Sequence, residues 1–405
     1  EVKIKIKRPG TEEPIIKTLI RQEIKINNVP YYGMINEEIG YIRISQFTMN
    51  AGDEVKKAFI ELKENMHADK IILDLRGNPG GLLIEAVNIC NIFMDKGQEI
   101  VSTKGKVSQW DKVYHGMHSP VDTEIPVIIL VNRGSASASE IVSGAFQDLD
   151  RGVIIGERTF GKGLVQTTRN LSYNSKLKIT TAKYYIPSGR CIQALDYSNR
   201  NDDGSVGKIP DSLITEYTTK NGRKVFDGGG VYPDVLTETE LLSNISASLL
   251  SKFLIFDFVT GYALKHDSIP KPGLFVFTSD DYDDFLAFLS DKDFDYKTNS
   301  ETELNDLINI AKKEKYYKTA ENQFSELKKI LAHDRDKDLQ TFRNEIIQLL
   351  SEEISCRYYY QRGRIETLLK SDKDIEKAIE IFSDMNKYEG ILKGTYKTGE
   401  QKETD

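Results

Sequence analysis

The chain has 405 residues, with 55 lysines and arginines against 62 aspartates and glutamates and a formal net charge of −7. This length indicates two or three domains and a sizeable core, and the acidic balance without a basic cluster argues against nucleic acid as a partner. Cys90, Cys191 and Cys356 are too few and too scattered for a disulfide framework or a CxxC metal site.

Residues 1–26 show the alternation of a two-stranded ribbon. Valine and isoleucine alternate with lysine in "VKIKIK", Pro9 and Gly10 interrupt the pattern, and "IIKTLI" resumes it. Such a ribbon is only marginally stable by itself.

From about residue 31 to residue 235, buried-strand runs alternate with helical stretches. The runs "KIILDL" (70–75) and "VIILV" (127–131) are continuously apolar, whereas "EVKKAFIELKENM" (54–66) has helical periodicity. This alternation predicts an α/β core with parallel strands.

The first of these strands ends in a glycine loop, Arg76-Gly77-Asn78-Pro79-Gly80-Gly81, before a helix begins. Such a loop can present a backbone N–H to a reacting carbonyl oxygen, as an oxyanion hole requires. A plain tight turn explains the glycines equally well.

The stretch "RGSASASEIVSGAFQD" (133–148) holds four serines and follows the second buried strand. Strand, tight loop and helix in this order often expose a nucleophile at a helix N-terminus. The alternative is structural, because Ser137 followed by Glu140 also matches a helix capping box.

The stretch "GVIIGERTFGKGLVQ" (152–166) resembles a phosphate-binding loop without being one. Gly163 stands where a serine or threonine would ligate magnesium, and the following residues alternate like strands, so we expect no nucleotide. Backbone crowding around Lys162 would remove water from its amine and lower its pKa, making it a base. The alternative is a solvated surface lysine.

Past Val235 the chain is mostly helical, and "LQTFRNEIIQLLSEEISCRYYYQRGRIETLLKSD" begins at residue 339. The most apolar stretch, 249–264, contains Lys252 and Asp257 and therefore predicts a buried or amphipathic helix instead of a membrane span.

Together, "DLRGNPGG", "NRGSASASEI", "GERTFGKGLVQ", "TTAKYYIPSGRCIQ" and "GGGVYPDV" resemble the carboxy-terminal processing (tail-specific) proteases, in that family's order and spacing. The resemblance covers about residues 1–240. It implies an α/β peptidase core like that of the crotonases and the Clp protease at 31–240 and a helical C-terminal domain at 241–405. The family's PDZ domain precedes the core, and residues 1–30 correspond only to its closing strands and a linker.

The same resemblance implies the site residues. Ser137 would be the nucleophile and Lys162 the base, with Gln166 orienting the lysine. Residues i and i+4 on a strand also share one face, which agrees with this role for Gln166. The oxyanion hole would combine the N–H of Ala138 with that of Gly80 or Gly81, and Gly81 is preferred.

Asp148 and the histidines are the other candidates for this site. Asp148 lies eleven helical residues beyond Ser137, about 16 Å along the axis, and is expected to be structural. The five histidines lie outside the motifs, so a Ser-His-Asp triad is the weaker alternative.

The resemblance implies a serine endopeptidase that cleaves unfolded polypeptides near their C-termini through an acyl-enzyme, without metal, cofactor or nucleotide. It implies a periplasmic or cell-envelope location, and the helical domain is a candidate surface for an oligomer or an adaptor. The alternatives are a non-catalytic peptide-binding relative and a helical scaffold.

Overall fold

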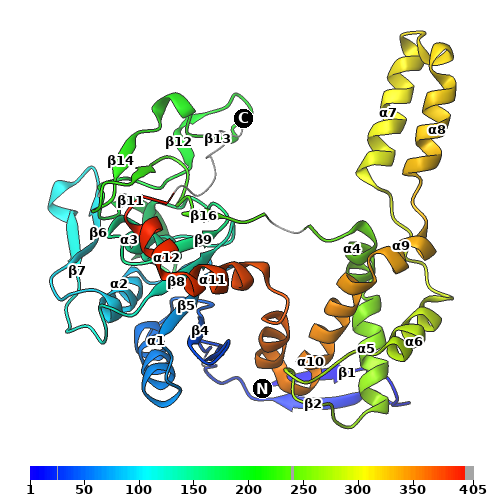
Figure 1. Cartoon of the computed structure of the whole chain (residues 1–405), viewed down its shortest axis with the longest axis horizontal. Helices are drawn as coiled ribbons and strands as arrows, with labels where there is room; N and C mark the ends of the chain where they lie inside the picture. Colours follow the sequence, from blue (N-terminus) through cyan, green and yellow to red (C-terminus); the bar gives the residue numbers. More distant parts are fainter. Residues whose placement is uncertain (25, 239–240, 397–405) are drawn as a thin grey trace. The chain divides into compact units, whose positions relative to one another are not determined.

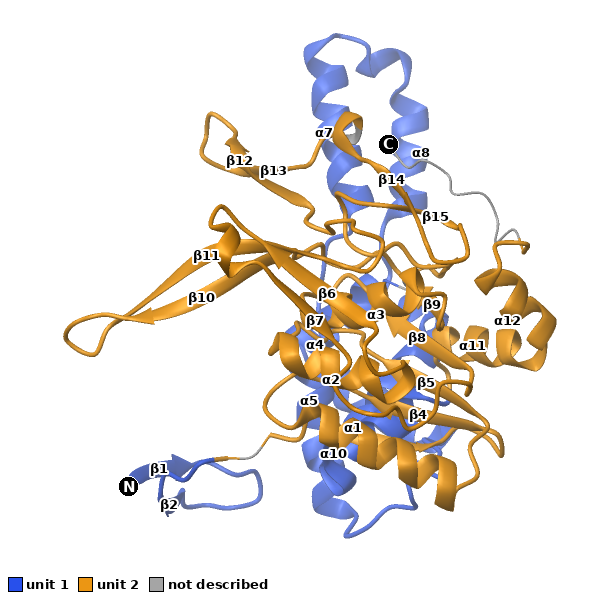
Figure 2. Ribbon diagram, turned by 90° about the vertical axis from the view of Figure 1, so that its left-hand side faces the viewer, with its two compact units in different colours: residues 1–23, 240–370 blue, residues 24–239, 371–405 orange. Residues whose placement is uncertain are grey.

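The computed structural model describes residues 1–24, 26–238 and 241–396. The chain divides into two compact units, one of residues 24–239 and 371–405 and the other of residues 1–23 and 240–370 (Figure 2). This division differs from the expected boundaries at both ends. The ribbon groups with the helical unit, and residues 371–405 group with the α/β unit because two C-terminal helices pack on its sheet.

The α/β unit is built on a six-stranded sheet with the order β16-β9-β8-β5-β4-β3. The strands are β3 (Tyr31–Met34), β4 (Ile39–Arg43), β5 (Lys70–Asp74), β8 (Val127–Val131), β9 (Val153–Gly156) and β16 (Val235–Leu236). All neighbouring pairs are parallel except β3 with β4. The predicted parallel α/β core is therefore confirmed.

Helices cover both faces of this sheet, as its fully buried strands require. On one face, α1 (Ala51–Ile60), α2 (Leu83–Phe93) and α3 (Ala138–Asp148) pack into the main hydrophobic core with side chains such as Leu73 and Ile129. Near β8 and β9 lie α11 (Lys373–Ser383) and α12 (Met385–Leu392), drawn in red in Figure 1. The Tyr388 hydroxyl bonds both the N–H and the carbonyl of Val127, at 3.0 and 3.1 Å.

A second sheet of four strands has the order β10-β11-β6-β7. Its strands are β6 (Glu99–Lys104), β7 (Lys112–His115), β10 (Leu164–Asn170) and β11 (Lys176–Tyr185). Two small hairpins pair β12 (Leu195–Arg200) with β13 (Val206–Lys208) and β14 (Glu216–Thr218) with β15 (Lys224–Phe226). The long β10–β11 hairpin (Figure 2) confirms that strands follow Lys162, as the alternation predicts.

The helical unit contains seven α-helices within its described residues. They are α4 (Asn244–Ser251), α5 (Leu254–Lys265), α6 (Ser279–Leu289), α7 (Asn299–Lys313), α8 (Glu321–Leu331), α9 (Arg335–Thr341) and α10 (Arg343–Leu368). Its core is a cluster of apolar side chains that includes Phe258, Phe285 and Ile346. The antiparallel ribbon of β1 (Val2–Ile6) and β2 (Ile15–Leu19) confirms the predicted strands.

The apolar stretch 249–264 is two helices, which corrects the expectation of one. Phe253 adopts a left-handed backbone (φ 59°), which ends the helical run between α4 and α5. Within the described residues no single helix is long and apolar enough to cross a membrane; α4 and α5 reach that length and composition only together, with a bend of 64° between them.

Candidate active site

Ser137 lies between β8 and α3, at the residue that precedes the helix. Its backbone is at φ 57° and ψ −112°, a region that side-chain-bearing residues rarely adopt and that costs about 1–3 kcal/mol. Such strain is retained where the surrounding structure holds it in place, often at functional sites. The strand, tight loop and helix predicted here are confirmed.

Burial distinguishes Ser137 from the neighbouring serines. Ser135, Ser139 and Ser143 are fully buried, whereas Ser137 is partly exposed. The Ser135 hydroxyl donates to the Leu75 carbonyl at 2.8 Å, and the Ser139 hydroxyl donates to the Asn78 carbonyl at 2.9 Å. Their hydroxyls hold the structure together, and Ser137 is the serine of this run that a substrate can reach.

The glycine loop packs directly against the Ser137 turn. Besides the two serine hydroxyls, the N–H of Ala136 donates to the Asn78 carbonyl at 3.0 Å. A Cβ added to Gly80 would lie 2.8 Å from both the Ala138 nitrogen and the Ser137 Cβ. Only a glycine allows this approach, so the tertiary structure brings together two motifs that are about sixty residues apart.

The backbone N–H groups of this loop are not equally available. The Gly80 N–H donates to the Asn78 side-chain oxygen at 2.9 Å, so it is already used. Within the part of the chain that the structure describes, no hydrogen bond uses the N–H of Gly81 or of Ala138. A Cβ on Gly81, whose φ is 157°, would lie 2.3 Å from the Phe47 carbonyl oxygen. Of the two glycines expected to provide an oxyanion donor, only Gly81 therefore has an N–H without a partner among the described residues.

Glu140 connects the Ser137 turn to the Lys162 turn. Its buried carboxylate accepts hydrogen bonds from the N–H groups of Ser137 (2.8 Å), Gly161 (2.7 Å) and Lys162 (2.9 Å), and from the Thr159 hydroxyl (2.6 Å). Burial raises the pKa of Glu140, although these four hydrogen bonds favour its ionised form and oppose that shift. Sequence reasoning identified Glu140 only as a capping residue and missed this connection.

Tyr184 on β11 provides a second connection between the same two turns. Its buried hydroxyl lies at hydrogen-bond distance from the Lys162 carbonyl and 3.2 Å from the Ser137 carbonyl. Burial raises the pKa of Tyr184 far above its ordinary value, so the hydroxyl stays protonated and able to donate. Its position in the motif "TTAKYY" was the available sequence signal.

The Lys162 turn is crowded at its backbone, as expected, but its side chain is exposed. A Cβ on Gly161 would lie 2.3 Å from the Ala194 Cβ, and one on Gly163 would lie 2.8 Å from the Gln193 nitrogen. This crowding does not extend to the amine of Lys162, so the expected loss of water around it is not present. Among the described residues, no hydrogen bond joins the side chains of Ser137 and Lys162.

Gln166 is exposed and lies in β10, which begins at Leu164. Lys162 precedes that strand, so strand alternation alone does not place the Lys162 and Gln166 side chains on one face. The argument from i and i+4 therefore assumed a strand that starts two residues too early.

Asp148, at the end of α3, is fully buried and pairs with Arg190 at 2.9 Å. It also accepts a hydrogen bond from the Ser188 N–H at 2.9 Å. Its expected structural role is confirmed by these contacts.

Two of the five histidines have contacts inside the helical unit. His333 binds Glu301 and Asp295, and His266 contacts the Tyr262 carbonyl, all within the helical unit. Across the described ranges, no group of three or more His, Cys, Asp or Glu side chains is arranged to hold a metal ion.

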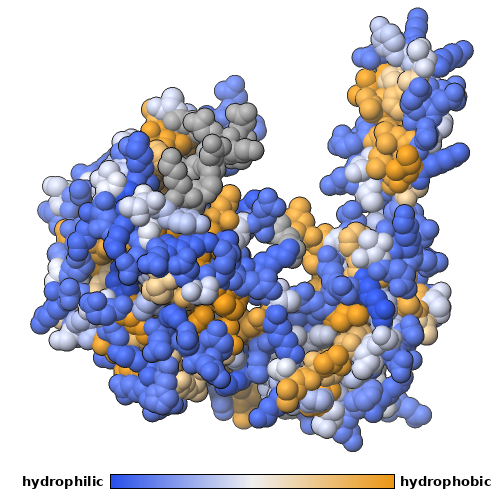
Figure 3. All heavy atoms as spheres, in the orientation of Figure 1, coloured by the Kyte–Doolittle hydropathy of each residue, from blue (hydrophilic) through white to orange (hydrophobic). Residues whose placement is uncertain are grey.

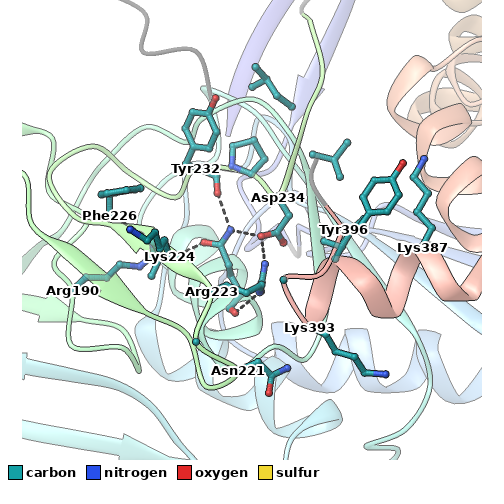
Figure 4. A pocket seen from close by; sticks show the side chains of 18 of the residues that line it. Arg190, Asn221, Arg223, Lys224, Phe226, Tyr232, Asp234, Lys387, Lys393 and Tyr396 are labelled. Atoms are coloured by element: carbon teal, nitrogen blue, oxygen red, sulfur yellow. Dashed lines mark hydrogen bonds and ion pairs between the residues drawn. The ribbon is translucent and has the colours of Figure 1, made fainter. Parts of the chain in front are cut away.

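A cavity of about 870 Å³ lies elsewhere in the α/β unit, between β15, residues 232–236 and the C-terminal helices (Figure 4). Arg223 binds Asp150 and Asp234 there, while Lys377 and Lys387 pair with Glu380. Neither Ser137 nor Lys162 lines it. Its basic groups are balanced by acidic partners, and the candidate active site remains at the Ser137 turn.

Comparison with known proteins gives two family matches. Residues 38–199 match the model of peptidase family S41, and residues 245–382 match the model described as "Probable PDZ-protease, C-terminal helical domain".

Curated relatives include a carboxy-terminal-processing protease of Bartonella bacilliformis, 41% identical over 197 residues, which are 48% of this chain and 45% of that protein. A carboxyl-terminal-processing protease of Synechocystis is 36% identical over 219 residues, 53% of this chain and 48% of that protein. The chain thus spans about half the length of these relatives. Among solved structures, the photosystem II D1 C-terminal processing protease is 31% identical, with a TM-score of 0.40, covering 58% of this chain and 55% of that one.

Proposed function

Because this chain carries a peptidase family S41 domain and is related to carboxy-terminal-processing proteases, we propose that it hydrolyses peptide bonds through an acyl-enzyme on Ser137. The observation that carries the proposal is the position of Ser137, the partly exposed serine at a strained turn, directly against a glycine loop with a free N–H. A serine hydroxyl in this position can attack a carbonyl whose oxygen is then stabilised by backbone donors.

The oxyanion donors in this proposal are the N–H groups of Ala138 and Gly81. The Ala138 N–H lies in the first turn of α3, where backbone donors have no partner within the helix and where the helix dipole favours negative charge. The Gly81 N–H has no partner among the described residues. Gly80 supports the site by its close approach to Ser137 instead of by donating.

Lys162 is the base in this proposal, with Gln166 orienting it. Glu140 and Tyr184 hold the backbones of Ser137 and Lys162 together, and in this proposal the long lysine side chain turns so that its amine meets the serine. The Lys162 amine takes the hydroxyl proton as Ser137 attacks the peptide carbonyl, and it gives that proton to the leaving amine as the peptide C–N bond breaks. Water then hydrolyses the acyl-enzyme.

The substrates in this proposal are unfolded polypeptides, cut near their C-termini, which the names of the relatives support. We place the protein in the periplasm or cell envelope, as the resemblance implies. An oligomer or adaptor would bind the helical unit, where α7 and α8 expose Leu307, Ile310 and Ile330; Figure 3 shows hydrophobic residues along this hairpin.

Labelling with a fluorophosphonate tests the proposed function. We expect covalent modification of Ser137, located by mass spectrometry of the digested protein, together with cleavage of a denatured protein substrate. An unlabelled protein that binds the same peptides tightly would instead identify a non-catalytic binding relative. Partner capture without labelling or peptide binding would identify a scaffold.

Replacing Lys162 with alanine should lower kcat/KM by about 10³-fold or more, because no base then removes the serine proton. Lys162→Arg should be equally inactive, since arginine stays protonated. The matched control is Lys183→Ala, an exposed lysine on β11, which should keep wild-type kinetics. Wild-type kcat/KM in Lys162→Ala would rule out a lysine base.

A further inference from the structure

Two acidic residues at the start of α11 contact Arg76, the first residue of the glycine loop. We propose that Asp372 and Asp374 are positioning residues that hold Arg76, and through it the oxyanion loop 77–81, in place. This inference rests on the proposed function for its catalytic consequence. Its structural consequence can be measured separately.

Both terminal nitrogens of the Arg76 guanidinium donate hydrogen bonds to these aspartates. Its Nη1 donates to Asp372 Oδ1 at 2.9 Å and to Asp374 Oδ2 at 2.8 Å, and its Nη2 donates to Asp372 Oδ2 at 2.6 Å. The Arg76–Asp372 pair is therefore bidentate, the geometry in which an arginine–carboxylate contact is most directional. The Arg76 side chain is only 16% exposed, so these carboxylates are partners in a partly buried setting.

The charges around Arg76 explain why the C-terminal segment is needed. Asp74 is the last residue of β5, two residues before Arg76. Its fully buried carboxylate pairs with both Arg76 and Arg43, so two guanidinium groups face one carboxylate. Burial favours the neutral carboxyl, but the two arginines outweigh it and hold the pKa of Asp74 well below its ordinary value. Without Asp372 and Asp374, this cluster keeps an uncompensated positive charge beside the glycine loop.

The backbone of Arg76 transmits this arrangement to the loop. Its N–H donates to Asp74 Oδ1 at 2.9 Å, and its carbonyl accepts from Arg43 Nη2 at 2.7 Å. The next residue, Gly77, donates its N–H to the Asn132 side chain at 2.8 Å, which leads to the Ser137 turn. The start of the oxyanion loop is therefore held at two points, Arg76 and Gly77, and Asp372 and Asp374 hold the first of them.

Asp372 lies where the chain re-enters the α/β unit. The chain returns from the helical unit at residue 371, immediately before Asp372. Docking of residues 372–392 on the α/β unit is therefore part of assembling the active site, although these residues are far from Ser137 in the sequence.

The double variant Asp372→Asn/Asp374→Asn tests the proposal, with Asp384→Asn as the matched control. Asp372 caps α11 and Asp384 caps α12, each through two backbone N–H groups, and asparagine caps helices as well as aspartate does. Among the described residues, Asp372 also binds an arginine, whereas Asp384 accepts only backbone N–H groups. The substitutions thus remove the charge while keeping both caps.

We expect kcat of the double variant to fall about tenfold or more with KM changed by less than about twofold, because an oxyanion donor acts in the transition state. Asp384→Asn should match the wild type. Asp372→Glu/Asp374→Glu, which keeps the charges, should recover part of kcat. Equal loss of kcat in Asp384→Asn and the double variant would show a general effect of the C-terminal segment and overturn the proposal.

Amide hydrogen exchange of residues 75–83, measured by mass spectrometry, gives a readout that needs no activity. Exchange there should be at least about tenfold faster in the double variant than in the wild type and in Asp384→Asn. Unchanged exchange overturns the proposal whether or not the protein is a peptidase. Faster exchange with unchanged kcat in an active enzyme overturns it as well, whereas failure of wild-type labelling and cleavage contradicts only the proposed function.

Discussion

Ser137→Ala is expected to lower turnover of a denatured protein substrate by about 10⁴-fold or more and to abolish fluorophosphonate labelling. The hydroxyl is the attacking group in the proposed mechanism, and no other serine of this run is exposed to substrate. The fold should be retained, because the side chain is small and partly exposed. Single-turnover cleavage and thermal unfolding of the two proteins provide the measurement.

Ser135→Ala and Ser139→Ala are the matched controls. Ser135→Ala removes two hydrogen bonds, to the Leu75 carbonyl and from the Asn132 N–H, and Ser139→Ala removes one, to the Asn78 carbonyl of the glycine loop. Each hydrogen bond is worth about 1 kcal/mol, so both variants should keep most of the activity and all of the labelling. Turnover by Ser137→Ala above the background of an uncatalysed reaction would contradict the assignment. Loss of labelling in Ser139→Ala with its fold intact would transfer the assignment to that residue.

Glu140→Ala is expected to have the second large effect, on stability and activity together. It leaves the N–H groups of Ser137, Gly161 and Lys162 and the Thr159 hydroxyl without their acceptor inside the protein, at roughly 3–5 kcal/mol of unfolding free energy. The Ser137 and Lys162 turns then lose their common anchor, and kcat/KM should fall by about 10²-fold or more. Urea unfolding and steady-state kinetics measure the two effects.

Glu85→Ala separates stability from activity. Glu85 is also buried, and it accepts the Gly52 N–H at 2.7 Å, a contact that joins α1 and α2 without touching the Ser137 or the Lys162 turn. It should lower stability and leave kcat near the wild-type value. Glu140→Gln, which keeps one acceptor oxygen, should lie between the wild type and Glu140→Ala. If Glu140→Ala and Glu85→Ala lost kcat equally, the anchoring role of Glu140 would be wrong.

Much of this site could be predicted because local patterns specify local structure. The continuous apolar runs predicted β5 and β8 as buried strands, and the alternation after Lys162 predicted β10 and β11. Glycines at Gly81 and Gly161 mark positions where a side chain would collide with backbone or with Ala194. The identity of Ser137 and Lys162 came from the resemblance of motifs, and their catalytic roles remain a prediction.

Other features depend on contacts between distant residues, and no local pattern encodes those. A glutamate three residues after a serine is a common helix capping pattern, and this pattern says nothing of further partners. Only the folded chain shows that Glu140 also binds Gly161 and Lys162. Likewise, Lys162 is exposed because of where its turn lies in the folded unit, and the flanking glycines do not specify that position.

The C-terminal part of the chain shows the same difference between local patterns and contacts of distant residues. By itself, the sequence determined that residues past 241 are mainly helical, because helical periodicity is a local property. It did not determine that α11 and α12 leave the other helices to pack with the sheet. Their position has two causes. They bury an apolar face of the sheet, and Asp372 and Asp374 pair with Arg76, which is almost 300 residues away in the sequence. Burial and charge compensation over such separations are decided only when the whole chain is folded.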